Sequence, residues 1–501
     1  MAHRFGAEAG HARAPSPSAT RGRWIGRIAG LAVFAGAAGL GTPIAPAGTP
    51  AAFALATVAL MVVWWATDAV PHWATALVPL VLFPVVGVYR GGALERAAAT
   101  ASPYFEAYVL LFLGGMAIAA ALQQTGLHRR LSLWILARTR SSPLRLLVGV
   151  FAATATVSLW ISNTAAAALV LPIALALLAE IAARAGDRPR FGAALVLAVA
   201  WGANVGGIGT KIGTATNMQL AGFLTGRGIE VSFVEFSLIG LGFVALLGPC
   251  AIAILWRFAR ADAPPPQALR LGIPDALDVP ARWTSGERAV GIVFALTAAT
   301  WIAAQPLAQV LASTFPDLGV RSRHVEAGAA LLAALVLAAW RPGGRALLSG
   351  AALRSMPWSA LLLIGGSFAL ASGIEHSGLS DSIAPAFERL STLPPLAQSL
   401  SVAGLAVLAS AFASNTATIA ILLPLIAAAA PAGRETTLLF AATIGSSCDF
   451  ALPAGTPPNA IALASGRVPF LVMVRAGIAL DVVAAVLCAL WCELVVRHVV
   501  G

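Results

Sequence analysis

The sequence predicts an all-α, polytopic membrane protein made of two related halves, and composition is the first reason. Of its 501 residues, 59% are hydrophobic and only 11% are charged, and the mean hydropathy is +0.85. Soluble domains of this size rarely carry so few charges. Uncharged stretches long enough for a helical span of about 20 residues recur along the chain: 28–67, 69–89, 146–179, 236–256, 289–316, 355–374 and 390–433. On this length rule we expect about ten to twelve crossings.

The distribution of positive charge predicts how the chain lies in the membrane. The net charge is +11, and its arginines gather before residue 28 and at 129–145, 257–288 and 341–354. The positive-inside rule places these groups, and therefore the N-terminus, on the cytoplasmic side of the cell inner (plasma) membrane. No basic run is interleaved with aromatic residues, which argues against nucleic acid as a partner. The polar residues 1–23 are expected to be a disordered cytoplasmic tail before an uncleaved first span.

Internal repetition is the second reason. The triplet Ser-Asn-Thr occurs at 162–164 and again at 414–416, and a Leu-Pro step follows each copy, at 171–172 and 423–424. A Gly-Thr-x-x-Asn turn comes later in each half, at 213–217 and 455–459. A Leu-rich segment ending in Gly-Gly precedes each triplet, at 110–115 and 361–366. Such matches in one order predict two structural repeats, and inverted topology is the usual arrangement in secondary transporters.

These features divide the chain into six predicted parts. Residues 1–23 form the tail, 259–286 form a Pro-rich cytoplasmic linker, and the remaining parts are helices at 24–102, a first repeat at 103–258, helices at 287–354 and a second repeat with a C-terminal span at 355–501. The two Gly-Gly segments are interpreted as re-entrant hairpins, because adjacent glycines weaken a spanning helix. The alternative is close helix packing through small residues.

Polar residues inside the apolar runs indicate a binding site. One helix cannot satisfy the amides of Asn163 and Asn415, and a local helix break beside them would expose groups for a small cation and for an anion. The Gly-rich stretches 206–217 and 455–459 are unsuited to a regular helix. Irregular backbone at membrane depth survives where it is buried or lines water, and it holds ions of either sign. The simpler alternatives are interhelical hydrogen bonds and extramembrane loops.

These motifs together resemble the divalent anion:sodium symporter family, the solute carrier 13-like transporters of dicarboxylates, citrate and sulfate. The matching pieces are the Trp-Trp segment 64–71, the first Gly-Gly segment, both triplets and the turn 455–459, and they cover the chain from about residue 50 to its end. The resemblance implies a homodimer in which residues 24–102 and 287–354 are scaffold helices. The repeats at 103–258 and 355–501 would form a transport domain that moves like an elevator. It implies sodium ions as co-transported cations, the lipid bilayer as environment and no organic cofactor.

The resemblance also assigns residues to the site. Its first sodium site would involve Ser158, Ser162, Asn163 and Gly213, and its second Ser410, Ala413, Asn415 and Gly455. The substrate carboxylates would meet Asn163, Thr164, Thr214, Ser414, Asn415, Thr416, Thr456 and Pro457. Hydroxyls and amides bind a carboxylate without a fixed cation, so bound sodium would supply the countercharge and couple the two.

Two residues depart from the family's pattern or add charge to it. Lys211, the single lysine, lies in the first Gly-rich turn, where relatives carry an apolar residue or proline. Its ammonium would substitute for sodium or contact the anion, which would reduce sodium dependence; alternatively it extends to a watery vestibule. Asp449 precedes the second turn and is the best candidate for an extra proton or cation role.

The leading expectation is a secondary active transporter of a C4-dicarboxylate or citrate driven by sodium. Sulfate transport and sodium-independent exchange of dicarboxylates are the alternatives within transport, and an anion channel is the alternative from another class. An enzyme is not expected, because the sequence offers no nucleophile–base pair or metal cluster. Nor does it contain a phosphate-cradling loop for ATP.

Overall fold

A computed structural model of the protein describes residues 17–42, 45–46, 48–139, 142–270, 282–383 and 388–500. The regular elements in these ranges are helices, with one isolated bridge between Thr42 and Ala45. Among the described residues, seven runs are long and apolar enough to cross a membrane: Ala93–Thr125, Asn163–Ala185, Phe233–Asp262, Ser322–Ala339, Trp358–His376, Pro395–Phe412 and Phe470–Val499. The chain is therefore a multi-pass membrane protein.

The number of long spans is smaller than the ten to twelve expected from the length rule. An eighth is counted if α14 (Ser285–Ile302) and α15 (Ala304–Thr314), which are bent by 68° at their junction, form one broken span. Other apolar runs are divided among helices of 10–17 residues, which are Pro50–Ala66, His72–Val86, Pro143–Ser158 and Asn415–Ala429. The stretches 146–179 and 390–433 each hold two helices because a triplet interrupts them.

The first repeat is a helix pair followed by a broken helix. α8 (Pro143–Ser158) ends just before the first triplet, and α9 (Asn163–Ala185) begins at its Asn. α10 (Pro189–Gly207) then packs against both, and after an irregular segment the chain resumes as α11 (Ala215–Gly226) and continues as α12 (Phe233–Ala259). The helix pair and the helix break are thus both placed by the motifs that the sequence repeats.

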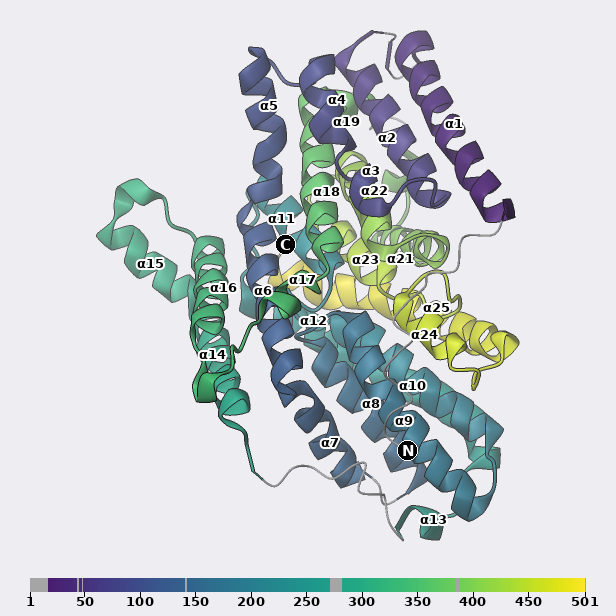
Figure 1. Ribbon diagram of the computed structural model, residues 1–501. Coiled ribbons are helices and arrows are strands. Elements are labelled where there is room, and N and C mark those ends of the chain that lie inside the picture. Colours follow the sequence, from purple (N-terminus) through teal and green to yellow (C-terminus); the bar gives the residue numbers. More distant parts are fainter. Residues whose placement is uncertain are drawn as a thin grey trace.

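The second repeat follows the same plan. α21 (Pro395–Phe412) and α22 (Asn415–Ala429) flank the second triplet, and both pack on α23 (Glu435–Ser446). A second irregular segment separates α23 from α24 (Pro457–Ala464), and α25 (Phe470–Trp491) corresponds to α12. In Figure 1, α8, α9 and α10 fill the lower part of the molecule while α22 and α23 lie above them, so the two triplets approach from opposite ends.

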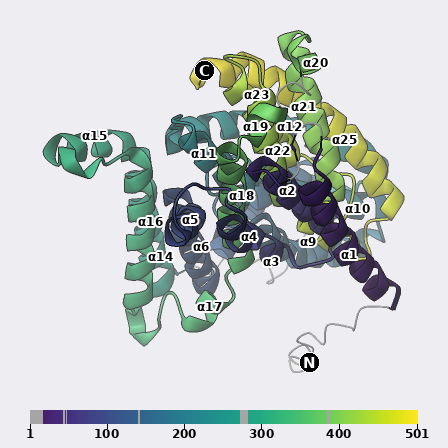
Figure 2. The same cartoon turned by 90° about the horizontal axis from the view of Figure 1, so that it is seen from above.

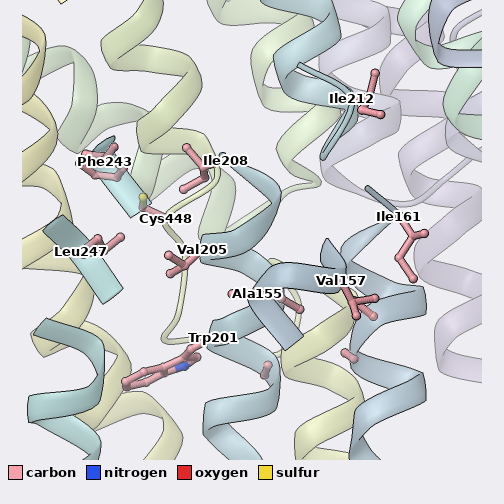
Figure 3. Packing of buried hydrophobic residues seen from close by; sticks show 14 of the residues in the cluster. Ala155, Val157, Ile161, Trp201, Val205, Ile208, Ile212, Phe243, Leu247 and Cys448 are labelled. Carbon is pink, nitrogen blue, oxygen red and sulfur yellow. The ribbon is translucent and has the colours of Figure 1, made fainter. Parts of the chain in front are cut away.

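The two repeats exchange the second halves of their broken helices. α11 of the first repeat packs on α22 and α23, and α24 of the second repeat packs on α9 and α10. Each triplet helix is therefore covered by the broken helix of the other repeat. Figure 3 shows part of the shared core, where Val205 of α10 and Ile208 just after it lie near Cys448 of the second break, with Phe243 of α12 beside Cys448 and Trp201 farther along α10.

The remaining helices surround this centre. α1 (Pro17–Leu40) pairs with α2 (Pro50–Ala66), and α18 (Trp358–His376) contacts α2, α22 and α4 (Val78–Val86). α6 (Ala107–Thr125), which continues α5 (Ala93–Ala101), packs along α16 (Ser322–Ala339), and α14 and α15 flank α16. Figures 1 and 2 show α15 extending away from the other helices. Smaller helices are α3 (His72–Thr75), α7 (Leu127–Thr139), α13 (Pro266–Arg270), α17 (Gly350–Arg354), α19 (Leu379–Ile383), α20 (Glu388–Ser391) and α26 (Arg497–Val499).

Parts of the predicted tail and linker lie outside the described residues, namely 1–16 and 271–281. Residues 17–23, which the sequence assigned to the tail, are the first turns of α1. α6 falls in the range 103–258 predicted for the first transport repeat, yet it lies along α16, which belongs to the range 287–354 predicted for the scaffold.

The Gly-Gly segments, interpreted from the sequence as parts of re-entrant hairpins, lie inside long helices that pack closely on their neighbours. Gly114 and Gly115 lie inside the span Ala93–Thr125, and Gly365 and Gly366 lie inside α18. The glycines are needed for close packing, because a Cβ at Gly114 would overlap the backbone of Ala330 and one at Gly366 would overlap the Ala76 carbonyl. Small residues that let helix backbones approach are common in membranes.

The contact between α8 and α10 leads to a first prediction. A Cβ at Gly206 would overlap the Ala155 carbonyl, so Gly206→Leu should force the two backbones apart and destabilise the protein by about 1–3 kcal/mol. The measurement is thermal unfolding in detergent. Gly404→Leu on α21 is the matched control, because nothing lies within 4 Å of a Cβ at Gly404. Equal loss of stability in both variants would contradict the packing argument.

Candidate substrate and cation site

The first triplet sits at a helix turn that is tied down by hydrogen bonds. α8 ends at Ser158, and the Ser162 hydroxyl accepts a hydrogen bond from the Ala165 N–H at the start of α9. The Ser158 hydroxyl lies 2.9 Å from Asn163 Oδ1 and 2.7 Å from the Ala203 carbonyl oxygen of α10. The Asn163 amide oxygen is thus held beside the end of α8 and close to α10.

The second triplet repeats the serine–asparagine contact of the first, without the side-chain cap that Ser162 forms. The Ser410 hydroxyl lies 2.7 Å from Asn415 Oδ1 and 2.6 Å from the Ser446 carbonyl oxygen of α23. Ser158 and Ser410 are both fully buried. Two unrelated helix ends would not share such a pattern, so the triplets are equivalent half-sites.

Each helix break is kept open by an asparagine that folds back onto its own turn. Asn217 Nδ2 donates to the carbonyls of Gly207, Ile208 and Thr210 at 3.0, 3.3 and 2.7 Å. In the second half, Asn459 Nδ2 donates to the Asp449 and Leu452 carbonyls, both at 3.1 Å. Backbone groups that the helix no longer pairs are satisfied in this way, which irregular backbone inside a membrane requires.

Side-chain hydrogen bonds also join the two breaks. Asn204 Nδ2 of α10 lies 3.0 Å from Thr456 Oγ1 and 3.4 Å from Asn459 Oδ1. The hydroxyls of Thr216 and Ser447 are 3.1 Å apart. All of these residues are buried. The two half-sites therefore form one polar centre.

A cavity of about 520 Å³ lies where the triplets and breaks meet. All of the residues predicted to bind substrate line it: Asn163, Thr164, Thr214, Ser414, Asn415, Thr416, Thr456 and Pro457. Of the predicted sodium ligands, Ser162, Asn163, Gly213, Asn415 and Gly455 also line it. Ser158 and Ser410 do not line the cavity, but their hydroxyls contact the amide oxygens of Asn163 and Asn415. Ala413 also lies outside the lining and follows the last residue of α21, directly before Ser414.

The electrostatic character of the cavity comes from helix ends. No charged side chain is among its lining residues in the described part of the chain. Four helices begin at its wall, α9 at Asn163, α11 at Ala215, α22 at Asn415 and α24 at Pro457. The N-terminus of a helix carries a partial positive charge and free N–H groups, which favour anions. The cavity is therefore suited to an anion without a fixed cationic side chain.

The opposite helix ends have an electrostatic character suited to cations. α8, α10, α21 and α23 all end at the turns beside the cavity, and the C-terminus of a helix carries partial negative charge. Carbonyl, amide and hydroxyl oxygens gather there, which are ligands that hard cations accept. In the described residues, no group of three or more His, Cys, Asp or Glu side chains is placed to hold a metal ion.

Lys211 is placed differently from the other predicted site residues. It is fully buried and does not line the cavity, whereas its neighbours Ile212 and Gly213 do. Its ammonium lies 2.8 and 3.1 Å from the two carboxylate oxygens of Glu326 on α16, and 5.1 Å from the ring centre of Tyr108. In this arrangement the ammonium neutralises Glu326, so the expectation that it substitutes for sodium or contacts the anion gains no support.

Sequence reasoning missed several residues of the polar centre. Asn204, Thr216 and Ser447 join the breaks but stand outside the repeated triplets. Asn204 carried a usable signal, since it is an amide inside the long uncharged run of α10. The cavity wall also includes Gln123 of α6, Ser355 before α18 and Ser359 in the first turn of α18. No pattern in the sequence connects these residues with the triplets.

Paired helix breaks around a polar cavity at the centre of a helical membrane protein are the architecture of secondary transporters. Residues 62–445 match the profile of the citrate transporter family. The chain belongs to this family of transporters, and it shares the features of the divalent anion:sodium symporters that its motifs resemble.

Similar proteins are known by sequence and by structure. The sodium-dependent dicarboxylate transporter SdcS of Staphylococcus aureus (strain USA300) is 30% identical over 466 residues, which cover 90% of this chain and 86% of that protein. The SdcS protein of Staphylococcus saprophyticus is also 30% identical, over 90% of this chain and 87% of its own length. Among solved structures, the YdaH transporter of Alcanivorax borkumensis superposes with a TM-score of 0.53 at 16% identity, covering 81% of this chain and 90% of that one. The last likeness concerns the fold alone.

Proposed function

We propose that this chain is a sodium-coupled secondary transporter of a small dianionic carboxylate, with a C4-dicarboxylate or citrate as substrate. The observation that carries the proposal is the cavity, which is lined by four helix N-termini and both triplets but by no charged side chain of the described residues. A dianion binds well there only when mobile cations bind beside it. The SdcS relatives are sodium-dependent dicarboxylate transporters by name.

The size of the cavity favours a carboxylate over sulfate. Its volume of about 520 Å³ corresponds to roughly 17 water molecules at about 30 Å³ each. Such a space has room for a four- to six-carbon acid with two separated carboxylates, and both triplets line it. A sulfate ion is compact and would leave one half-site to water. Sulfate transport is therefore the second candidate.

We assign the two cation sites to the two half-sites. The first would use Ser162, Asn163 and the Gly213 turn, with Ser158 holding Asn163 in place; the second would use Ala413, Asn415 and Gly455, with Ser410 holding Asn415. Each asparagine then offers its amide oxygen to sodium and its N–H₂ group to the substrate. Binding of either ligand would orient the amide for the other, which gives coupling between them.

We further propose that transport proceeds by an elevator motion in a homodimer with a cytoplasmic N-terminus. The repeats around the cavity would move as one body against the helices that include α14, α16 and α18, and α6 would belong with the static part because it lies along α16. The extended α15 exposes Leu307, Val310 and Leu311, which would lie in the dimer interface or in lipid. The arginine distribution supports the orientation.

The test is uptake of labelled succinate into proteoliposomes that contain the purified protein. We expect saturable uptake that an inward sodium gradient accelerates at least ten-fold and that unlabelled citrate or succinate suppresses more than sulfate does. Uptake that needs preloaded dicarboxylate but no sodium would identify an exchanger. Strong suppression by sulfate with no succinate uptake would identify a sulfate transporter, and conductance without saturation would identify a channel. Each of these results would overturn the proposal.

A further inference from the structure

We infer that Asp449 is an anionic ligand of the cation in the second half-site, so that one cation is held by a full negative charge and the other by neutral groups only. The inference rests on the proposed function, because it assigns this residue to one of the two cation sites. It concerns the carboxylate of the second break, which the triplets and the repeated turns do not include.

The Asp449 carboxylate is fully buried and nearly without hydrogen bonds. Its side chain is 0% exposed, and Oδ2 has no hydrogen-bond partner among the described residues. Oδ1 lies 3.5 Å from Asn415 Nδ2, which is a weak contact by distance. None of the ion pairs in the described part of the chain involves Asp449.

The unpaired oxygen points at the predicted ligands of the second cation. A Cβ placed on Gly455 would overlap Asp449 Oδ2 and would lie 3.1 Å from the Ser410 carbonyl oxygen. The carboxylate oxygen, the Ser410 carbonyl and the Gly455 backbone therefore converge on one point. Asn415 Oδ1 is next to them through its hydrogen bond with Ser410. These are oxygen donors of the kind that a small hard cation takes.

The surroundings of Asp449 increase the need for a cation. A buried carboxylate without a partner is expensive, because it loses its hydration and gains nothing in return. The nearby acidic residue is Asp481 of α25, whose Oδ1 accepts a hydrogen bond of 2.7 Å from the Phe450 N–H. Asp481 adds repulsion rather than neutralisation. A sodium ion placed between the Asp449 carboxylate, the Ser410 carbonyl and the Gly455 backbone would neutralise Asp449 and offset the repulsion from Asp481.

The first half-site has no such carboxylate. Asn217 donates to the Gly207 carbonyl and Asn459 donates to the Asp449 carbonyl, so Gly207 and Asp449 occupy equivalent positions in the two breaks. Gly207 instead lies against the Asn163 side chain, where a Cβ would overlap Asn163 Oδ1. The two halves therefore differ in charge at the one position that faces the cation, and the second site should bind its cation more tightly.

The experiment is a sodium titration of thermal unfolding with the purified full-length protein in detergent, with choline chloride holding the ionic strength constant. We expect sodium to raise the melting temperature of the natural protein in a saturable way. In Asp449→Asn, and in Asp449→Gly, which copies the first half, the half-saturating sodium concentration should rise about ten-fold or more because a charge–charge attraction is lost. Asp317→Asn, which neutralises an exposed carboxylate in the short turn after α15, is the control and should keep the natural value.

The outcomes separate this inference from the proposed function. No stabilisation of the natural protein by sodium, together with sodium-independent uptake, would defeat the proposed sodium coupling itself. A natural response that both Asp449 variants retain would overturn only the role of Asp449. Without sodium, Asp449→Asn should melt no lower than the natural protein, because an unpaired buried charge has been removed; a lower melting temperature or misfolding would also overturn the inference.

Discussion

Replacing Lys211 by methionine should destabilise the protein by about 3–5 kcal/mol, the largest loss that we expect from a single substitution. Lys211 and Glu326 are both fully buried, and their charged groups contact each other. Removing one partner leaves the other as an uncompensated charge inside the protein. Glu326 also accepts a hydrogen bond from the Phe233 N–H at the start of α12, so its position matters to two helices. Thermal and denaturant-induced unfolding in detergent measure the effect.

The double variant Lys211→Met/Glu326→Gln is the control for this prediction. It removes both charges and keeps an acceptor for the Phe233 N–H, so most of the lost stability should return, since neutral replacement of a buried ion pair is often tolerated. If the single and double variants were equally unstable, the pair would not be the cause. If Lys211→Met were as stable as the natural protein, the ammonium would not be paired with Glu326.

The same pair bears on transport. Lys211 lies in the first helix break and Glu326 lies on α16. In the proposed elevator, this ion pair therefore joins the moving part to the static part. The double variant should then fold normally but change the rate of uptake, while the half-saturating succinate concentration stays the same. A changed half-saturating concentration with an unchanged rate would place the pair in substrate binding instead.

The combined change Asn163→Ala and Asn415→Ala should reduce sodium-driven uptake by at least 100-fold. Each amide lines the cavity at the first turn of a helix and is held by a buried serine at 2.9 or 2.7 Å. A hydrogen bond to a charged group contributes about 1.5–3 kcal/mol, and a loss of 1.4 kcal/mol is a ten-fold loss of affinity. Each single change should therefore cost roughly ten- to a hundred-fold in succinate affinity.

The matched control for these asparagines is Thr443→Val on α23. Thr443 is buried, and its hydroxyl donates to the Leu439 carbonyl of its own helix without lining the cavity. Uptake by the Thr443→Val variant should be close to that of the natural protein. If one asparagine variant abolished uptake while the other left it unchanged, the equivalence of the half-sites would be refuted.

Much of the site was predictable because polar groups inside hydrocarbon have few roles. Two copies of Ser-Asn-Thr in apolar runs predicted paired half-sites, and the structure gathers both copies around one cavity. The same argument located the helix breaks at 208–214 and before Pro457. These predictions held because they rest on the cost of unsatisfied polar groups, which does not depend on the details of packing.

What remained hidden depended on contacts between distant parts of the chain. The Gly-Gly segments could be singled out because glycine weakens helices, but the partner backbones at Ala330 and Ala76 that require glycine are not visible in a sequence. The partner of Lys211 lies on α16, far along the chain, and nothing near Lys211 points to Glu326. Several apolar runs are divided among shorter helices, because a hydropathy run does not reveal where a helix ends or turns back.

The exchange of α11 and α24 between the repeats has a consequence for biosynthesis. Because α11 packs on α22 and α24 packs on α9, the N-terminal half leaves the ribosome before the helices that shield its polar turn exist. Until the C-terminal half is synthesised and inserted, that polar turn lacks its protein partner and must be covered by water, by lipid headgroups or by an insertion factor. Halves made as separate chains should therefore be short-lived alone and long-lived when produced together.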